Sequence, residues 1–431
     1  MIGRQLDVLR RAPGFRRLFL ATLGSGLGTG MAVIALTVDV FDRTGSGTWV
    51  AALLVADFLP MLVIGLLLGP LVDRFSRRRV LVVSDLIRFA VFCVLPFAGS
   101  PAAIVGLAAV IGFATGFFRP SVYAGMPNLV AERDLSHANS LFQSIENVTF
   151  MVGPLIGGVL LAVSGTGLVY GLNAATFLLS AGLIVGISDA SLQAGAAESK
   201  GHWHDLAAGF RLVLRSRPLT TVLVVWTIVM LANAQVNVSE VALAKVSFGA
   251  GNLGFGVLAA CAGLGLMLGS VSAGSVLEQR PVSMVYGGSI GLMAFGFGAA
   301  ALSPSIWIAA VSVVVSGFGN GVASVCNPLF VQRGAPDHLR GRAFTVVMSV
   351  NFAMLGVGMA LAGPFTDWAG ARWVWGAAAL VYVGASVVAL LMARGTAWAT
   401  EEAQAPPVPA PVVEPRETVG FGATRYLGKS S

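Results

Sequence analysis

The sequence predicts an all-α membrane protein with twelve transmembrane helices in two pseudo-symmetric six-helix bundles. Hydrophobic residues make up 56% of the 431 residues and charged residues only 11%, whereas soluble domains carry roughly a quarter charged residues. Twelve apolar runs follow one another, each long enough to cross ~30 Å of hydrocarbon as a helix. Glycines also repeat at a shift of 205 residues, as in Gly112 with Gly317 and Gly158 with Gly363.

The predicted spans are continuous apolar runs separated by polar connections. A membrane β-barrel would instead show alternating segments of roughly ten residues, so these runs indicate helices. The first run is too long for the apolar part of a signal peptide and lacks a small-residue cleavage site, which indicates a retained helix. The runs lie at about 15–39, 48–72, 80–99, 102–125, 137–163, 168–187, 218–246, 252–277, 282–302, 305–330, 341–367 and 371–393.

The repeat and the polar connections predict four parts of the chain. Residues 1–187 form an N-terminal six-helix bundle, and residues 218–394 form a C-terminal one. The polar stretch 188–217 between them is a cytoplasmic linker. Residues 395–431 are rich in proline, alanine and glutamate, a composition that cannot bury a core, so we expect a disordered cytoplasmic tail.

The positions of lysine and arginine predict the orientation of the chain. Of the 27 such residues, 22 lie in the termini and the even-numbered connections, and only Arg43, Lys245 and Arg372 lie in odd-numbered connections. Cytoplasmic loops carry the excess of basic residues, so both termini are expected in the cytoplasm of a multi-pass cell membrane protein. The net charge of +7 is then a topology signal, and no nucleic-acid partner is expected. The basic segments can also touch anionic lipid headgroups.

Metal, cofactor and enzyme chemistry find no support in the sequence. The three cysteines lie inside apolar runs, and the four histidines all lie in polar connections. His202 and His204 flank a tryptophan but have no further ligands nearby, which favours a loop helix over a metal site. Neither a phosphate-binding G-x-x-x-x-G-K-[ST] loop nor an H-E-x-x-H zinc motif is present. We therefore expect no metal, no cofactor and no enzymatic activity.

The connection between the second and third runs carries a family resemblance. It resembles the G-x-x-x-D-R-x-G-R-R signature of the major facilitator superfamily, with Ser76 in place of the inner glycine. The segments 85–88 and 173–177 are similar to the efflux branch that contains enterobactin exporters and macrolide efflux proteins. The connection reads Gly69-Pro70-Leu71-Val72-Asp73-Arg74-Phe75-Ser76-Arg77-Arg78-Arg79.

The resemblance covers about residues 10–395 and implies a function. It implies a secondary active transporter that exports a small amphipathic molecule, drug-like or siderophore-like, by alternating access. It further implies a proton as the coupling ion, a lipid bilayer as the surroundings and a monomer as the working unit. An uptake permease or a lysophospholipid flippase of the same fold is the alternative.

The same connection is expected to act as a conformational latch. Asp73 ends a helix and can accept hydrogen bonds from the N-terminus of a neighbouring helix, where the dipole favours an anion. The resemblance implies that such contacts, with arginine–carboxylate pairs, hold the two halves shut on the inner side. We expect Arg119 to pair with Asp73 or Asp85; alternatively, the arginine run only fixes the topology. The latch residues are Gly69, Asp73, Arg74, Arg77, Arg78 and Arg119.

A second partial signature lies in the fifth run. Gly153, Pro154, Gly157 and Gly158 resemble the antiporter signature G-x-x-x-G-P-x-x-G-G, with Thr149 in place of the upstream glycine. Small residues let helices approach closely, and proline can kink a helix. The match favours export over uptake, with ordinary tight packing as the alternative. The arginine that drug/proton exporters often carry four residues before a fourth-helix glycine is absent, so proton coupling through it is not implied.

Carboxylates within spans are costly and therefore point to function. Asp57, Glu146 and Glu240 lie in the second, fifth and seventh runs, together with the amides Asn147 and Gln235. We expect these side chains to line a central cavity between the halves. One carboxylate would bind a cationic group of the substrate, and another would take up a proton, because burial disfavours the charged form.

Two alternatives remain for the charged groups within spans. Glu146 with its neighbour Asn147 can form a structural bond between helices instead of a cavity site. Asp85 and Arg88, three residues apart on one helix face, are expected to neutralise each other rather than bind substrate.

Overall fold

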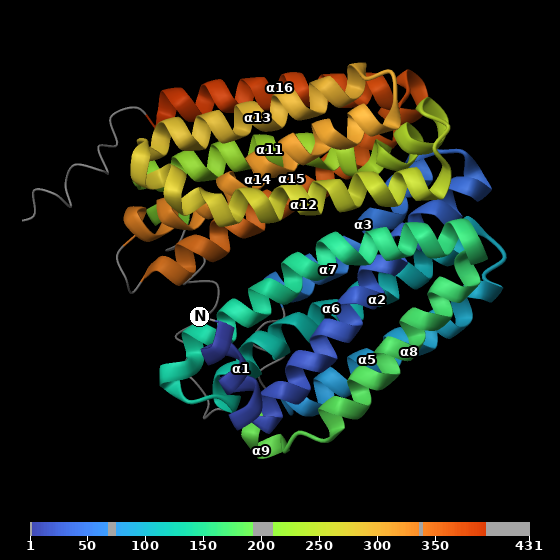
Figure 1. The fold of residues 1–431 in the computed structure, drawn as a ribbon, viewed down its shortest axis with the longest axis vertical. Helices are drawn as coiled ribbons and strands as arrows, with labels where there is room; N and C mark the ends of the chain where they lie inside the picture. The colour runs from blue at the N-terminus through green and yellow to red at the C-terminus, as the bar shows by residue number, and fades with distance from the viewer. Residues whose placement is uncertain (1, 68–74, 193–209, 336–338, 394–431) are drawn as a thin grey trace, which may run out of the picture. The chain divides into compact units, whose positions relative to one another are not determined.

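The computed structural model describes residues 2–67, 75–192, 210–335 and 339–393 as a helical protein (Figure 1). Twelve of its helices are long and apolar enough to cross a membrane, which confirms the predicted class. The short helices α1 (Ile2–Arg11) and α9 (Asp189–Leu192) flank the first six spans. The spans are α2 (Pro13–Thr44), α3 (Gly47–Leu67), α5 (Arg77–Val94), α6 (Pro101–Gly125), α7 (Leu135–Ser164), α8 (Thr166–Val185), α11 (Arg217–Ala242), α12 (Gly251–Gln279), α13 (Val282–Leu302), α14 (Ile306–Gly334), α15 (Arg340–Ala369) and α16 (Ala371–Met392).

Local sequence signals set several helix ends. The hydroxyl of Ser100 accepts a hydrogen bond from the amide of Ala103 and begins α6, and Ser305 caps α14 in the same way. Glycines with positive φ make the tight turns, where a side chain would be strained. Gly165 between α7 and α8 and Gly370 between α15 and α16 have φ of 75° and 82°, and the shift of 205 residues relates them.

The helix bundle has two ends, which we name by their connections. The hairpin face is the end with the short turns α2–α3, α7–α8 and α15–α16. The terminal face is the opposite end, where α1 and the last turn of α16 lie (Figure 1). Because spans alternate in direction, α3 runs from the hairpin face to the terminal face and α15 runs back.

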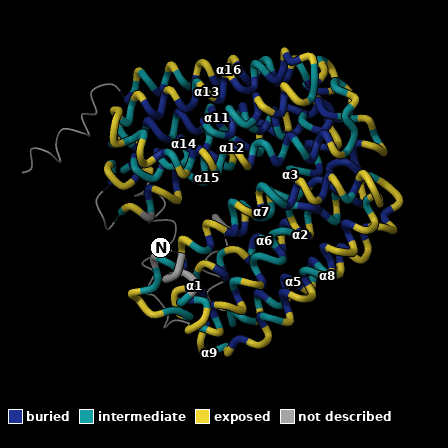
Figure 2. The backbone as a smooth tube through the Cα atoms, in the orientation of Figure 1, coloured by how far each residue is buried: buried dark blue, intermediate teal, exposed yellow. Residues whose placement is uncertain are grey.

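The helices form two groups of six, α2–α8 and α11–α16, which pack tightly within themselves. Buried residues lie between helices and exposed ones on the outside (Figure 2). Many of the exposed residues are large and apolar, as lipid tails allow. Two helix pairs make the main contact between the groups, α7 with α12 and α3 with α15. The repeat relates these two seams to each other.

Part of the predicted linker packs on the first group. Helix α9 follows α8 directly, and its Leu192 is fully buried in a cluster with Val8, Phe118 and Ile187. The linker segment 193–209 and the predicted tail lie outside the described residues. The domain boundaries themselves stay a prediction.

Candidate functional site

The predicted latch is only partly visible. Gly69, Asp73 and Arg74 lie outside the described residues, so the proposed role of Asp73 stays a prediction. Ser76, which replaces the glycine of the signature, begins α5: its hydroxyl accepts from the amide of Arg79 at 3.3 Å. The same hydroxyl donates to Asp189 Oδ1 at 2.5 Å. Serine is therefore a functional replacement as a helix cap, and it connects the loop to α9.

The arginines of the connection bind backbone carbonyls, contrary to the expectation of carboxylate partners. Arg77 donates to the carbonyl of Ala124 at 3.0 Å and to that of Leu192 at 2.9 Å. Arg78 donates to the carbonyl of Val185 at 2.5 Å. These carbonyls lie at or near helix C-termini, where unpaired oxygens and the dipole favour cations. In this conformation both arginines hold the first group together at the terminal face.

Arg119 binds Glu146, and not Asp85, which was one of its two expected partners; the other, Asp73, lies outside the described residues. The Nη2 of Arg119 lies 2.7 Å from Glu146 Oε1, and the hydroxyl of Tyr123 donates to the same oxygen at 2.5 Å. This cluster joins α6 to α7. The side chains of Arg119 and Glu146 are 52% and 36% exposed, so the pair is accessible. Glu146 thus forms a bond between helices, with Arg119 as its partner, and its place in a cavity stays a prediction.

A second charged cluster is fully buried within the first group. Asp85 and Arg88 form an ion pair at 2.5 Å, which confirms that they neutralise each other. Ser180 donates to Asp85 at 2.7 Å. The guanidinium of Arg88 also lies over the rings of Phe118 and Phe177, at 4.2 and 4.4 Å from their centroids. These contacts from α6 and α8 fix the arginine in place.

Asp57 lies within electrostatic range of this cluster but forms no hydrogen bond or ion pair with it among the described residues. It is half-buried on α3, and the charge of Arg88 acts on its carboxylate. Its backbone touches Gly112 of α6, where a Cβ would lie 3.0 Å from the Asp57 Cα. Among the described contacts, none joins Asp57 to Glu146 or Glu240. The three predicted cavity carboxylates therefore occupy separate environments.

Glu240 and the two amides differ in their partners. Glu240 is half-buried one turn before the end of α11, near the hairpin face, and its carboxylate has no hydrogen bond or ion pair within the described chain. The Oε1 of Gln235, one turn earlier, is buried without a partner. Asn147 accepts a long bond of 3.5 Å from Gln143 on its own helix. Of these side chains, Glu240 is the best candidate for reversible protonation.

The antiporter-like element packs α7 against two helices at once. A Cβ on Gly153 would lie 2.8 Å from the Cα of Gly30 on α2, and one on Gly157 would lie 2.9 Å from that of Met31. A Cβ on Gly158 would lie 2.8 Å from the Cα of Gly256 on α12, in the other group. The glycines thus bring backbones together both within the first group and across the seam.

Thr149 fits in place of the signature glycine because the opposing residue is small. A Cβ on Gly26 of α2 would lie 3.0 Å from the methyl group of Thr149. The hydroxyl of Thr149 donates to the carbonyl of Ile145 at 2.8 Å, within its own helix. At this contact the glycine therefore lies on α2, and the larger residue lies on α7 at the position where the signature has a glycine.

The seam face of α7 changes character along the helix. Toward the hairpin face, Gly158 and Met151 contact α12, where Met151 packs on Gly263. One and two turns closer to the terminal face, the same face continues as Asn147 and Ser144, and Ser144 is exposed. A helix places residues seven apart on one face. This face of α7 is therefore apolar and closely packed toward the hairpin face and polar toward the terminal face.

Two polar contacts that the sequence analysis missed close the seams at the hairpin face. Asp367 of α15 accepts hydrogen bonds from the amides of Gly47 and Thr48 at the start of α3, at 2.5 and 3.1 Å. Beside the other seam, Lys245 joins Asn252 at the start of α12 to Asp42 of α2 in the first group. A sequence signal for Asp367 exists: the spacing Gly-Pro-x-x-Asp of 69–73 recurs at 363–367.

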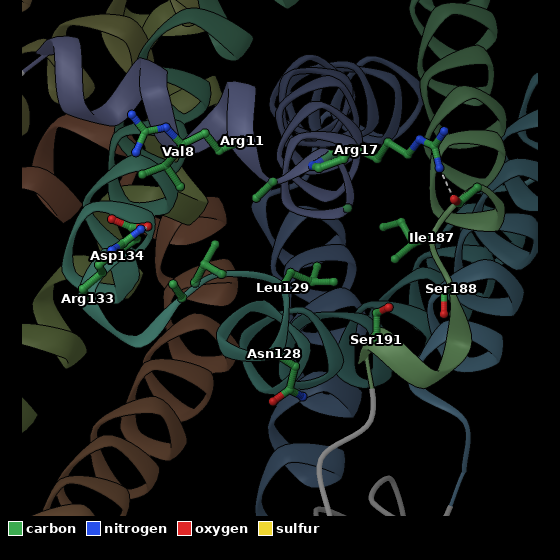
Figure 3. Close-up of a pocket in the computed structure, with 16 residues that line it drawn as sticks. Val8, Arg11, Arg17, Asn128, Leu129, Arg133, Asp134, Ile187, Ser188 and Ser191 are labelled. Atoms are coloured by element: carbon green, nitrogen blue, oxygen red, sulfur yellow. Dashed lines mark hydrogen bonds and ion pairs between the residues drawn. The ribbon is translucent and has the colours of Figure 1, made fainter.

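A pocket of about 590 Å³ opens at the terminal face, within the first group (Figure 3). Arg11, Arg17 and Arg133 line it, together with Asp134. Arg17 is already bound to the carbonyl of Gly186. The pocket is therefore distinct from the central cavity that we expected between the halves. In the described part of the chain, no cluster of three or more histidine, cysteine or acidic residues could hold a metal.

Comparisons with known proteins agree with this architecture. The profile of the transmembrane secretion effector family matches residues 9–419. The multidrug efflux pump Tap of Mycolicibacterium fortuitum is 29% identical over 403 residues, which cover 89% of this chain and 97% of that protein. The enterobactin exporter EntS of Salmonella typhi is 27% identical over 368 residues, or 83% and 87% of the two chains.

Solved structures share the fold at low sequence identity. The nucleoside transporter NupG superposes with a TM-score of 0.71 at 14% identity, covering 88% of this chain and 99% of that one. A bacterial homologue of the iron transporter ferroportin, in its inward-facing state, gives 0.68 at 15% identity, covering 88% and 98%. With its twelve spans and its match over most of its length, the chain is a multi-pass membrane transporter, not an enzyme, and it belongs to the transmembrane secretion effector family of the major facilitator fold.

Proposed function

We propose that the chain is a secondary active exporter that moves a small amphipathic molecule out of the cell in exchange for protons. The observation that carries the proposal is that the contact between the two groups differs between the two faces of the molecule. Glycine contacts and polar bonds join the groups at the hairpin face, whereas the same face of α7 is polar toward the terminal face. A seam of this kind fits a pathway that opens to one compartment at a time.

The charge distribution supports the direction. With the excess of basic residues in the cytoplasm, the terminal face is the inner one, and the present conformation takes up substrate from the cytoplasm or the inner leaflet. The names of the relatives Tap and EntS, an efflux pump and an exporter, support export. A drug-like or siderophore-like molecule is therefore the proposed substrate class, and the monomer is the proposed working unit.

The separate carboxylates support separate tasks. Glu146 is accessible and shared with Arg119 and Tyr123, which suits it to recognise polar groups of the substrate. Glu240 has no partner in the described chain and lies behind the closed hairpin face, which suits it to carry the proton. Asp57, beside the buried Arg88, couples the first group to this exchange.

Inverted membrane vesicles provide the test. Ethidium and enterobactin serve as probes, and we expect one of them to accumulate only while a proton gradient is present. Glu240→Gln is expected to abolish gradient-driven accumulation and to preserve probe binding. Glu278→Gln is the matched control, because Glu278 is exposed at the end of α12 and should transport normally.

Other outcomes would assign a different activity. Accumulation in right-side-out vesicles instead would reverse the direction and indicate an uptake permease. Transfer of a fluorescent lysophospholipid without transport of either probe would indicate a flippase. If Asp57→Asn, Glu146→Gln and Glu240→Gln all retain full coupled transport, the assignment of the three carboxylates is wrong.

A further inference from the structure

We infer that Asp367 is the latch that holds the hairpin face closed, by capping the first turn of α3 from the opposite group. The inference rests on the proposed alternating access and identifies a residue that controls it. Asp367 stands four residues after the seam glycine Gly363 and two residues before α15 ends. Its position brings a carboxylate of one group to a helix N-terminus of the other.

The contact is a helix cap supplied in trans. Asp367 accepts from the backbone amides of Gly47 and Thr48 and from the hydroxyls of Ser46 and Thr48, the latter two at 2.8 and 2.6 Å. A capping residue normally precedes its own helix and satisfies amides that have no partner within the helix. Here the side chain comes from a residue about 320 positions away in the sequence, in the other group. The cap therefore forms only when the two groups meet at the hairpin face.

The helix dipoles make the contact depend on closure. A carboxylate near the C-terminus of its own helix is unfavourable, whereas the N-terminus of another helix favours it. Asp367 thus has an unfavourable position within α15 that the start of α3 offsets. When the hairpin face opens, the amides of Gly47 and Thr48 lose this acceptor. Asp367 then loses the favourable interaction with the N-terminus of α3 and keeps only its unfavourable position near the C-terminus of α15. The cap consequently biases the protein toward the conformation closed at this face.

The surrounding packing makes the contact possible. A Cβ on Gly363 would lie 2.7 Å from the Cα of Thr48, and one on Gly47 would lie 2.8 Å from the Cβ of Thr366. These small residues bring the end of α15 against the start of α3. Beside the other seam the ion pair of Lys245 with Asp42 joins only side chains. Breaking that pair would therefore not remove a helix cap, whereas breaking the Asp367 contact would.

The test measures opening of the hairpin face directly. Spin labels replace Val163 and Leu302, which are exposed near this face in the two groups, in a variant without the three native cysteines. Loss of a charge-assisted cap in Asp367→Asn is expected to raise the ratio of open to closed molecules about tenfold. Asp367→Ala should shift it at least as far.

One control keeps the effect specific. Arg43→Gln removes a charge from the same face, but Arg43 binds Asp39 and the carbonyl of Ala98 in its own group and away from both labels, so the label distance should not change. An unchanged open fraction in both Asp367 variants would overturn the latch. An equal shift in Arg43→Gln would also overturn it, because the effect would then not depend on the cap.

A cross-link separates failure of the latch from failure of alternating access. Gly47→Cys with Thr366→Cys places two thiols across the seam, and oxidation should arrest transport until a reductant is added. Full transport by the oxidised protein would overturn the proposed alternating access itself. Reversible arrest together with an unaltered open fraction in Asp367→Asn would overturn only the role of Asp367.

Discussion

At the scale of single residues, the charged side chains within the spans differ in how deeply the protein buries them. The pair of Asp85 and Arg88 is buried, at 0% and 5% side-chain exposure, and further contacts surround it. The pair of Arg119 and Glu146 is similar in distance but accessible. Buried pairs are costly to break, whereas exposed pairs contribute little to stability. The first pair is therefore expected to matter for stability, and the second is the one to which we assign a role in the proposed transport.

Removing the buried carboxylate should destabilise the protein strongly. Asp85→Asn leaves the guanidinium of Arg88 buried without its counter-ion, so we expect a loss of about 3 kcal/mol or more in the free energy of unfolding. Thermal unfolding in detergent measures it. Asp57→Asn is the comparison, because Asp57 forms no hydrogen bond among the described residues. A loss in Asp57→Asn that equals the loss in Asp85→Asn would contradict this distinction.

Reversing the accessible pair should change transport more than stability. Arg119→Glu alone places two acids together, and the double change Arg119→Glu with Glu146→Arg restores an opposite pair. We expect the single variant to lose transport with less than about 1 kcal/mol of destabilisation and the double variant to regain part of it. Arg133→Gln, an exposed arginine with a loose 3.9 Å ion pair, is the control. Equal transport in all three variants would remove Glu146 from the pathway.

At the scale of elements, α7 shows how one helix can pack on two neighbours in different groups. Gly153 and Gly157 approach α2 within the first group, whereas Gly158 and Met151 meet α12 of the second group. Small residues are needed on both sides because helices in a membrane associate through close packing. In the proposed alternating access only the contact with α12 would have to open.

Bulk on the seam should force the groups apart at the hairpin face. In Gly158→Leu the new side chain meets the Cα of Gly256, and in Gly363→Leu it meets that of Thr48. Overpacking of this kind costs about 1–3 kcal/mol, so the labels at positions 163 and 302 should report a larger open fraction and transport should fall. Gly171→Leu, where the Cβ has open space, should leave both unchanged. No change in Gly158→Leu would mean that this seam does not separate.

At the scale of the whole molecule, the two groups are related by the repeat, but their seams are closed by different chemistry. The glycine contacts at Gly158 and Gly363 correspond to each other through the shift of 205 residues. Only one seam carries the Asp367 cap, and the other carries the pair of Lys245 and Asp42. The repeat therefore extends to the close packing of the halves but not to the polar contacts at the hairpin face.

The orientation of the molecule can be tested with single cysteines. We expect Phe97→Cys at the hairpin face to react with a membrane-impermeant maleimide on intact cells, because that face has few basic residues. Arg79→Cys at the terminal face should react only after permeabilisation. Both positions are exposed, so burial does not explain a difference. The reverse pattern would invert the topology and the proposed direction of transport.

Sequence alone predicted the spans, because the physical requirement is local. A helix in hydrocarbon satisfies its own backbone and needs only about twenty apolar residues in succession. All twelve predicted runs appear as helices, with ends that differ by a few residues. The close packing of Gly153 and Gly158 was also predictable, because small residues at fixed spacing have few other uses in a membrane helix.

Partner choice was decided only by the tertiary structure. Arg119 binds Glu146 and not Asp85, and Arg77 binds carbonyls instead of carboxylates. Each choice depends on how neighbouring helices are rotated and which helix ends meet, and a hydropathy pattern contains neither. Asp367 illustrates the limit: its sequence shows an acid after a glycine and a proline, but only the packing of α15 on α3 makes it a cap.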